Sequence, residues 1–390
     1  MKAKMADVKL GIFSLLLGAA AGAVIWLLMM GMALGMKVVW QIVPVYFQWS
    51  HPLAYDLTVC LAGGVLIAWV QKRSNSCLEP MFSVFARVKR EGGYPYHQLQ
   101  WMAAAFLLPI VFGGAIGPAA GLTGFVAGVW TLICACLNGR LKHPVLFKKV
   151  ENLSGRRRIV LYSLGALSLI IVLSGLLGAV GGIHLPRFRR EHAIGWEQWK
   201  WALVLIALGI LMALFYTIVD DLMARLAKKL MKYRTLMCVV TGGIVGMIVY
   251  FWPNIPFAGD TQLSLLFGQW TSYTVGVLVL AALLKMLLTV WCLNFGWRGG
   301  NFFPLIFAGT AVAYAFTLFA QNVSNNCMLD QNFAAALVVS AMIGFLVKKP
   351  LPAVVVLLFC FPLTYIFPLT VAVLVAGKMA VIVERRKRIV

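Results

Sequence analysis

Acidic side chains are scarce in this chain. Only 12 of its 390 residues are Asp or Glu, against 34 Lys and Arg, and charged residues of both signs make up 12% of the sequence. No carboxylate lies in the middle of an apolar segment with a second carboxylate or a histidine at ligand spacing, and no Ser, His and Asp set stands out. The sequence therefore gives no support to an enzyme, and we predict no catalytic residue, no metal site and no cofactor.

Hydrophobic residues dominate instead. They account for 62% of the chain, far above the share in soluble proteins, which indicates an integral, multi-pass membrane protein. The formal net charge of +22 comes from short basic runs between apolar segments, so it is not a nucleic-acid signature. Such runs mark the cytoplasmic face. We therefore expect both termini to be cytoplasmic and the protein to lie in the bacterial inner (plasma) membrane.

The apolar segments predict an all-α membrane protein. Several are shorter than the roughly 20 residues that a full span needs, and the last one is longer, with Pro362 and Pro368 inside it. Short and interrupted helices predict that some stop inside the membrane, where irregular backbone is tolerated only if protein or a watery cavity surrounds it. The segments cover about residues 8–36, 53–70, 97–112, 118–137, 159–182, 199–224, 235–252, 273–295, 303–320, 331–347 and 352–382.

Two glycine-rich segments, far apart in the sequence, echo each other. The first glycine motif, residues 113–118, reads GGAIGP, and the second glycine motif, residues 299–304, reads GGNFFP. Each ends one apolar segment and opens another, with Pro in the first turn of the new helix, where its missing N–H costs nothing. Such a helix start presents about four unpaired N–H groups and roughly half a positive charge. Two helix starts of this kind at mid-membrane predict an anion site without a charged side chain.

The second glycine motif also carries a family resemblance. Its residues GNFFP resemble the G-x-F-x-P signature of the CLC chloride channels and transporters, and GAIGP in the first motif resembles that family's G-[KR]-E-G-P. Further segments are similar to the surroundings of the signature: TGGIVG at 241–246 with the loop 253–259 after it, the helix 283–292 that begins LLK, and KPLPA at 349–353. Most of the resemblance lies within about residues 199–380.

The resemblance implies a CLC-like bundle of tilted, partly broken transmembrane helices built as an inverted repeat. Residues 1–183 would form a shortened first repeat and residues 184–390 the second, with no soluble regulatory domain. Ser76 would donate a hydroxyl to the anion, although the segment NSCLEP around it is only weakly similar to the family's G-S-G-I-P. The other anion-binding residues that the resemblance implies are Gly114, Ile116, Gly117, Gly300, Asn301, Phe302 and Phe303.

Plainer interpretations of these residues stay open. The glycines also suit close helix packing in a membrane, and Asn301 suits a helix cap. Lys285 lies in an apolar segment, where a charge is costly. It either raises the positive potential for anions, or it snorkels or pairs with a carboxylate.

The chain departs from the family pattern at a position that matters for mechanism. In the family's exchangers the Glu of G-[KR]-E-G-P accepts protons and competes with the anion, whereas this chain has Ile116 at that gate position. Residues 138–183 also leave room for one clear helix where the family usually has three, so the internal proton-relay Glu and part of the dimer interface are missing. A homodimer is therefore left open.

We expect passive, channel-like or uniporter passage of small monovalent anions, chloride foremost, across the lipid bilayer. Two alternatives stay open. One is a proton-coupled or fluoride-type anion transporter that uses unrecognised groups, and the other is a non-conducting membrane protein that retains the fold.

Overall fold

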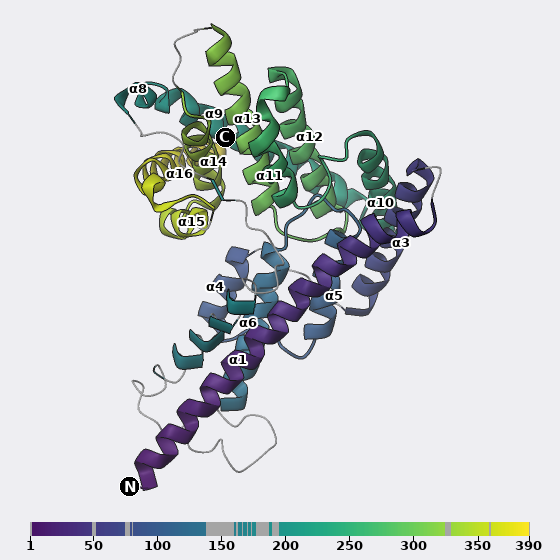
Figure 1. Ribbon diagram of the computed structural model, residues 1–390, viewed down its shortest axis with the longest axis vertical. Coiled ribbons are helices and arrows are strands. Elements are labelled where there is room, and N and C mark those ends of the chain that lie inside the picture. Colours follow the sequence, from purple (N-terminus) through teal and green to yellow (C-terminus); the bar gives the residue numbers. More distant parts are fainter. Residues whose placement is uncertain are drawn as a thin grey trace. The chain divides into compact units, whose positions relative to one another are not determined.

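The computed structural model describes most of the chain as helices (Figure 1). The described residues are 2–48, 52–74, 79, 81–137, 195–323, 329–358 and 360–389, with short pieces at 160, 163–165, 167–169, 171–172, 174–176 and 187–188. They divide into two compact units. The first comprises Met1–Ser50, Trp69–Phe112 and Pro118–Ile183, and the second comprises His51–Ala68, Gly113–Gly117 and His184–Val390.

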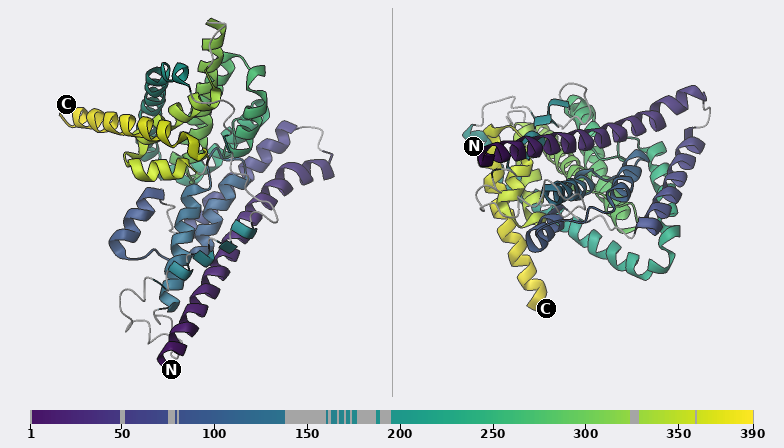
Figure 2. Two further views of the ribbon diagram at one scale, coloured as in Figure 1. Left: turned by 60° about the vertical axis from the view of Figure 1, so that its left-hand side comes forward. Right: turned by 90° about the horizontal axis from the view of Figure 1, so that it is seen from below.

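The first unit is organised around one long helix (Figure 2). This helix, α1 (Lys2–Lys37), continues through a π-helical turn (Val38–Ile42) into α2 (Val43–Tyr46). It packs along α5 (Leu99–Val111) and α6 (Ala119–Leu137), and α4 (Met81–Glu91) packs on α6. Apolar side chains from α1 and α6 form the buried centre of this unit, among them Ile25, Met29, Phe125 and Val129.

The second unit holds most of the core. Its helices are α3 (Pro52–Ser74, up to Ala68), α8 (Trp196–Trp199), α9 (Ala202–Lys229), α10 (Arg234–Phe251), α11 (Asp260–Gln269), α12 (Val275–Asn294), α13 (Phe302–Val323), α14 (Gln331–Val347), α15 (Pro350–Leu357) and α16 (Ile366–Ile389). At its centre α14 packs against α9, α13 and α16. All residues of α14 from Asn332 to Phe345 are buried, as expected for a helix that is apolar on every side.

Small residues bring α3 and α10 into backbone contact. A Cβ atom added to Gly242 would lie 2.2 Å from the Cys60 carbonyl oxygen, and one added to Gly246 would lie 2.9 Å from the Asp56 carbonyl oxygen. The spacing of four residues puts both glycines on one face of α10, which is a common arrangement for tight helix packing in membranes. The TGGIVG segment is therefore a packing surface.

The all-α membrane fold predicted from the sequence is confirmed. Among the described residues, seven helical stretches are long and apolar enough to cross a membrane: Gly11–Tyr46, Pro52–Arg73, Ala202–Lys229, Arg234–Phe251, Val275–Asn294, Phe302–Val323 and Leu363–Arg385. The long apolar segment 352–382 is interrupted before Pro362 and gives two helices, α15 and α16. Helices α4 and α11 were not predicted from the sequence, and the two repeats divided at residue 183 stay a prediction.

Candidate functional site

The two glycine motifs meet within the second unit. The Gly117 N–H donates to the Gly300 carbonyl oxygen at 2.6 Å, and the Gly300 N–H donates to the Gly117 carbonyl oxygen at 2.7 Å. These two bonds form an isolated antiparallel bridge, and both glycines are buried. The bridge brings together the motifs that the sequence paired by their similarity. It also occupies both N–H groups, so neither glycine is a free donor to an anion in this structure.

The first glycine motif is held on several sides. Gly113 has φ +88°, a conformation that favours glycine, and its carbonyl oxygen accepts from the Phe257 N–H at 3.0 Å. The Ile116 N–H donates to the Gly114 carbonyl oxygen at 2.8 Å. The Thr289 hydroxyl lies 2.8 Å from the carbonyl oxygens of both Ala115 and Lys285, and its single proton is shared between these two acceptors. Because the N–H groups of Ile116 and Gly117 are both bonded within the protein, this buried motif forms a wall of the site.

Ile116 fills the gate position with hydrocarbon. Its side chain is fully buried, and a Cβ atom added to Gly299 would lie 2.6 Å from the Ile116 Cδ1 atom. Gly299 is therefore a glycine because Ile116 packs directly on its backbone. The contact joins the two motifs through side-chain packing as well as through the Gly117–Gly300 bridge.

The second glycine motif leads into a helix whose first N–H groups lack acceptors among the described residues. The helix α13 starts at Phe302, and its first intrahelical bond among the described residues runs from the Leu305 N–H to the Asn301 carbonyl oxygen at 3.1 Å. Within the described part of the chain, no acceptor is found for the N–H groups of Phe302 and Phe303. Both stand at the positive end of a helix of 22 residues.

A tyrosine from α9 lies beside this helix start. The Asn301 side-chain amide donates to the Tyr216 hydroxyl oxygen at 3.0 Å, and Tyr216 is buried. Because the hydroxyl oxygen accepts this bond, its own proton is available, and no acceptor for it is found among the described residues. Tyr216 therefore places an O–H donor next to Asn301, the residue that precedes α13. Asn301 acts here through its side-chain amide nitrogen, toward Tyr216.

Lys285 is fully buried in α12 and binds the loop that contains residues 255–257. Its ammonium donates to three backbone carbonyl oxygens, those of Ile255 at 2.7 Å, Pro256 at 3.0 Å and Phe257 at 2.8 Å. The three N–H groups of the ammonium are thus all used, and within the described residues the charge neither snorkels to the surface nor pairs with a carboxylate. The Phe257 N–H in turn holds Gly113, so Lys285 supports the first glycine motif through this loop.

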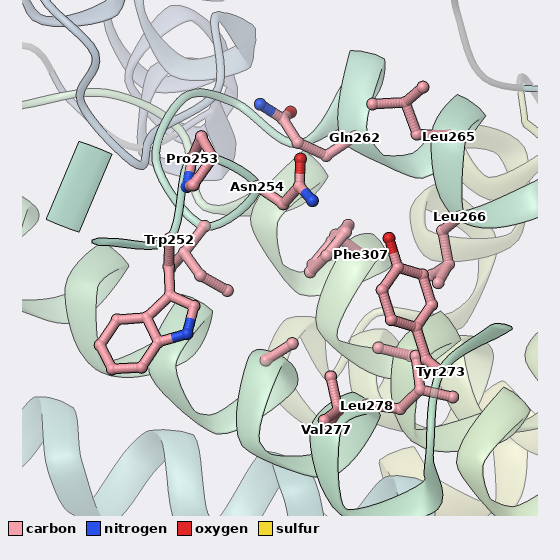
Figure 3. A pocket seen from close by; sticks show the side chains of 13 residues that line it. Trp252, Pro253, Asn254, Gln262, Leu265, Leu266, Tyr273, Val277, Leu278 and Phe307 are labelled. Carbon is pink, nitrogen blue, oxygen red and sulfur yellow. The ribbon is translucent and has the colours of Figure 1, made fainter. Parts of the chain in front are cut away.

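A cavity adjoins the same loop. This cavity of about 150 Å³ lies between Trp252, Pro253 and Asn254 of the loop and the helices α11, α12 and α13 (Figure 3). The side-chain oxygen of Gln262 is buried at this cavity and has no hydrogen-bond partner within the described residues. Packing against the loop is incomplete at this cavity, and the loop is held by its backbone bonds and by Lys285.

The structure brings most of the predicted site residues together. Gly114, Ile116 and Gly117 lie in the wall, Gly300 closes the bridge, and Asn301, Phe302 and Phe303 form the helix start. Ser76 lies outside the described residues. Tyr216 and Thr289 were missed, because no local motif marks either residue within its long, mostly apolar helix.

Comparison with known proteins supports the same family. The model of the voltage gated chloride channel family matches residues 126–380. The H(+)/Cl(-) exchange transporter ClcA of Vibrio campbellii is 21% identical over 219 residues, which cover 54% of this chain and 46% of that protein. ClcA of Vibrio cholerae is 23% identical over 150 residues, or 38% of this chain and 32% of that protein. The chain thus matches less than half the length of these curated relatives.

Solved structures share the fold over nearly the whole chain. A slow cyanobacterial Cl-/H+ antiporter superposes with a TM-score of 0.71 at 15% identity, covering 95% of this chain and 94% of that one. A CLC-type fluoride/proton antiporter gives a TM-score of 0.64 at 16% identity, covering 96% and 95% of the two chains. The family match spans more than half of the sequence and includes the second glycine motif. This multi-pass membrane protein therefore belongs to the voltage-gated chloride channel family of CLC proteins.

Proposed function

We propose that this protein passes small monovalent anions, chloride foremost, across the membrane, and that the start of α13 is its anion site. The observation that carries the proposal is the pair of N–H groups at Phe302 and Phe303, which have no acceptor among the described residues and stand at the positive end of a long helix. Such donors bind an anion without a charged side chain, and they are stronger in a low-dielectric interior than in water. The Tyr216 hydroxyl supplies a third donor beside them.

We further propose that the passage is passive. Coupling to protons requires a group that titrates within the anion pathway. The gate position holds Ile116, whose side chain has no proton to exchange and is buried against Gly299. The wall formed by the first glycine motif also contains no ionisable side chain. By the positive-inside rule, we place the basic ends of α9 and α16 on the cytoplasmic side.

A proton-coupled mechanism is the second candidate, and the comparisons favour it. The curated relatives bear the name H(+)/Cl(-) exchange transporter, and the two superposed structures are described as antiporters, one of them for fluoride. A coupled mechanism here would need a titratable group other than residue 116.

The test is anion efflux from proteoliposomes. Vesicles loaded with chloride should release it when valinomycin and potassium clamp the membrane potential, and a proton ionophore should not change the rate. A chloride gradient should fail to move protons. Uphill proton movement would establish coupling instead, and the absence of efflux above protein-free vesicles, with folded protein, would establish a non-conducting member of the family. Fluoride in place of chloride tests the fluoride-type alternative.

A further inference from the structure

A second pocket lies at the basic end of α9. It has a volume of about 250 Å³ and is formed by the end of α9, the start of α10 and the segment that follows α12. Three cationic side chains line it, Lys228, Arg234 and Arg298. Apolar side chains complete the lining, including Leu230, Met237 and Phe295. None of these residues belongs to the proposed anion site at α13.

The segment after α12 that carries Arg298 is bonded to both α9 and α10. Trp297 is fully buried, and its indole N–H donates to the Cys238 carbonyl oxygen of α10 at 2.9 Å. On the other side, the Asn294 side-chain amide donates to the Asp220 carboxylate of α9 at 2.8 Å. Because the backbone on both sides of Phe295 is anchored, the pocket is formed before any ligand arrives. Little ordering cost is left for binding.

Part of the pocket's positive charge has no ion-pair partner among the described residues. Neither Lys228 nor Arg298 forms an ion pair in the part of the chain that the structure describes. The sequence around them is strongly basic, since Arg225, Lys229 and Lys232 follow the two acidic residues at 220–221. A concave surface lined by positively charged side chains favours an anionic ligand.

The size of the pocket and the kind of cation that lines it select the class of anion. A water molecule takes about 30 Å³ of liquid volume, so the pocket is far larger than a single halide ion requires. Arginine presents a planar fork of donors that matches the oxygens of a phosphate group. Two arginines and a lysine around one hollow therefore suit a phosphate better than a halide.

We infer that this pocket binds the phosphate group of an anionic membrane lipid. Both α9 and α10 are long and apolar enough to span the membrane. Each carries exposed apolar side chains within two turns of the pocket, Leu222 and Leu226 on α9 and Leu236 and Val240 on α10. These surfaces suit acyl chains next to a bound headgroup, and basic pockets between membrane helices are a recurring kind of lipid headgroup site. Free phosphate shares the polar chemistry but makes no use of the apolar surfaces.

The test measures lipid binding, so it does not depend on whether the protein transports anions. Purified protein in neutral detergent is titrated with short-chain phosphatidylglycerol or phosphatidylcholine, and bound lipid is counted by native mass spectrometry. The double variant Lys228→Gln/Arg298→Gln should weaken phosphatidylglycerol binding about tenfold or more. The matched control Lys229→Gln/Lys232→Gln removes two charges from the same end of the molecule but from outside the pocket, and should change binding less than about twofold.

Any of the following three results would overturn the inference. Equal losses in the two double variants would mean that the lipid responds to the net charge of the surface and not to the pocket. Equal affinity for phosphatidylcholine and phosphatidylglycerol would exclude the headgroup as the recognised element. Inorganic phosphate that competes with the lipid at equal concentration would make free phosphate the ligand. Arg298→Lys keeps the charge but loses the planar fork, so it should bind phosphatidylglycerol more weakly than the parent and more tightly than the double variant. Thermal unfolding in neutral detergent checks that every variant is folded.

Discussion

The two glycine motifs look alike in sequence but use their backbones differently. In the first, the N–H groups of Ile116 and Gly117 are bonded inside the protein, and carbonyl oxygens are held by Thr289 and Phe257. In the second, the Gly300 N–H is bonded, but the N–H groups of Phe302 and Phe303 have no acceptor among the described residues. The first motif uses the N–H groups of Ile116 and Gly117 within the protein, whereas the second leaves the N–H groups at the start of α13 as donors. Similar local residues produce similar chain breaks, and tertiary contacts then give them different chemistry.

The largest expected effect comes from removing the support of the wall. Lys285→Met would leave the carbonyl oxygens of Ile255, Pro256 and Phe257 without their donor. Leaving several buried polar groups unpaired should cost about 3 kcal/mol or more of folding stability. The measurement is the thermal unfolding midpoint in detergent. Lys378→Met, which removes an exposed lysine from α16, is the matched control and should unfold near the parent's midpoint.

The second-largest effect is expected at the contact between the two glycine motifs. In Gly299→Ala the new Cβ atom would meet Ile116, whose Cδ1 atom lies 2.6 Å away, and such overpacking typically costs about 1–3 kcal/mol. Chloride efflux should fall as well, because the shift displaces the backbone next to the start of α13. Ile116→Ala in the same chain should relieve the clash. The double variant should therefore lose less free energy of unfolding than the two single variants lose together. Simple additivity would show that the two motifs are not coupled through this contact.

Much of this arrangement could be predicted from the sequence, but the difference between the motifs could not. Apolar segments and glycine breaks depend on local residue order, so most of the helices between α9 and α14 and the two breaks were found. The bonds that assign the roles join residues far apart in the chain, such as Thr289 to Ala115 and Asn301 to Tyr216. No local pattern marks such partners. Lys285 was flagged because a buried charge is costly, yet its three carbonyl partners became visible only in the fold.

A carboxylate in the wall would sharpen the comparison further. Ile116→Glu places an acidic group at the family's gate position, beside the Gly117–Gly300 bridge. When charged, it should compete with the anion for the donors at Phe302 and Phe303 and reduce chloride efflux at neutral pH. Burial favours the neutral carboxyl and nearby N–H groups favour the charged one, so the pKa of the new side chain is set by their balance. Protonation at lower pH removes the competing charge.

Efflux from the Ile116→Glu variant should therefore rise as the pH falls through the pKa of the introduced carboxyl group, whereas the parent should change little between about pH 5 and 8. Ile116→Gln is the matched control, because it has nearly the same shape but does not titrate. It should show no acid activation. A variant with the glutamate that follows the parent's efflux at every pH would mean that residue 116 does not face the anion pathway, and the assignment of the first motif as its wall would be wrong.

The smallest effect is expected at the donor site itself. Tyr216→Phe keeps the ring but removes the hydroxyl that accepts from Asn301, so the proposed site loses one of its three donors and keeps the two N–H groups of α13. Stability should fall by about 1 kcal/mol, the usual net value of one hydrogen bond, and chloride efflux should fall roughly three- to tenfold. Tyr250→Phe removes an exposed hydroxyl from α10 and should leave both quantities unchanged. If Tyr216→Phe lowers stability but not efflux, the tyrosine only positions Asn301, and the N–H groups of Phe302 and Phe303 would be sufficient for the anion.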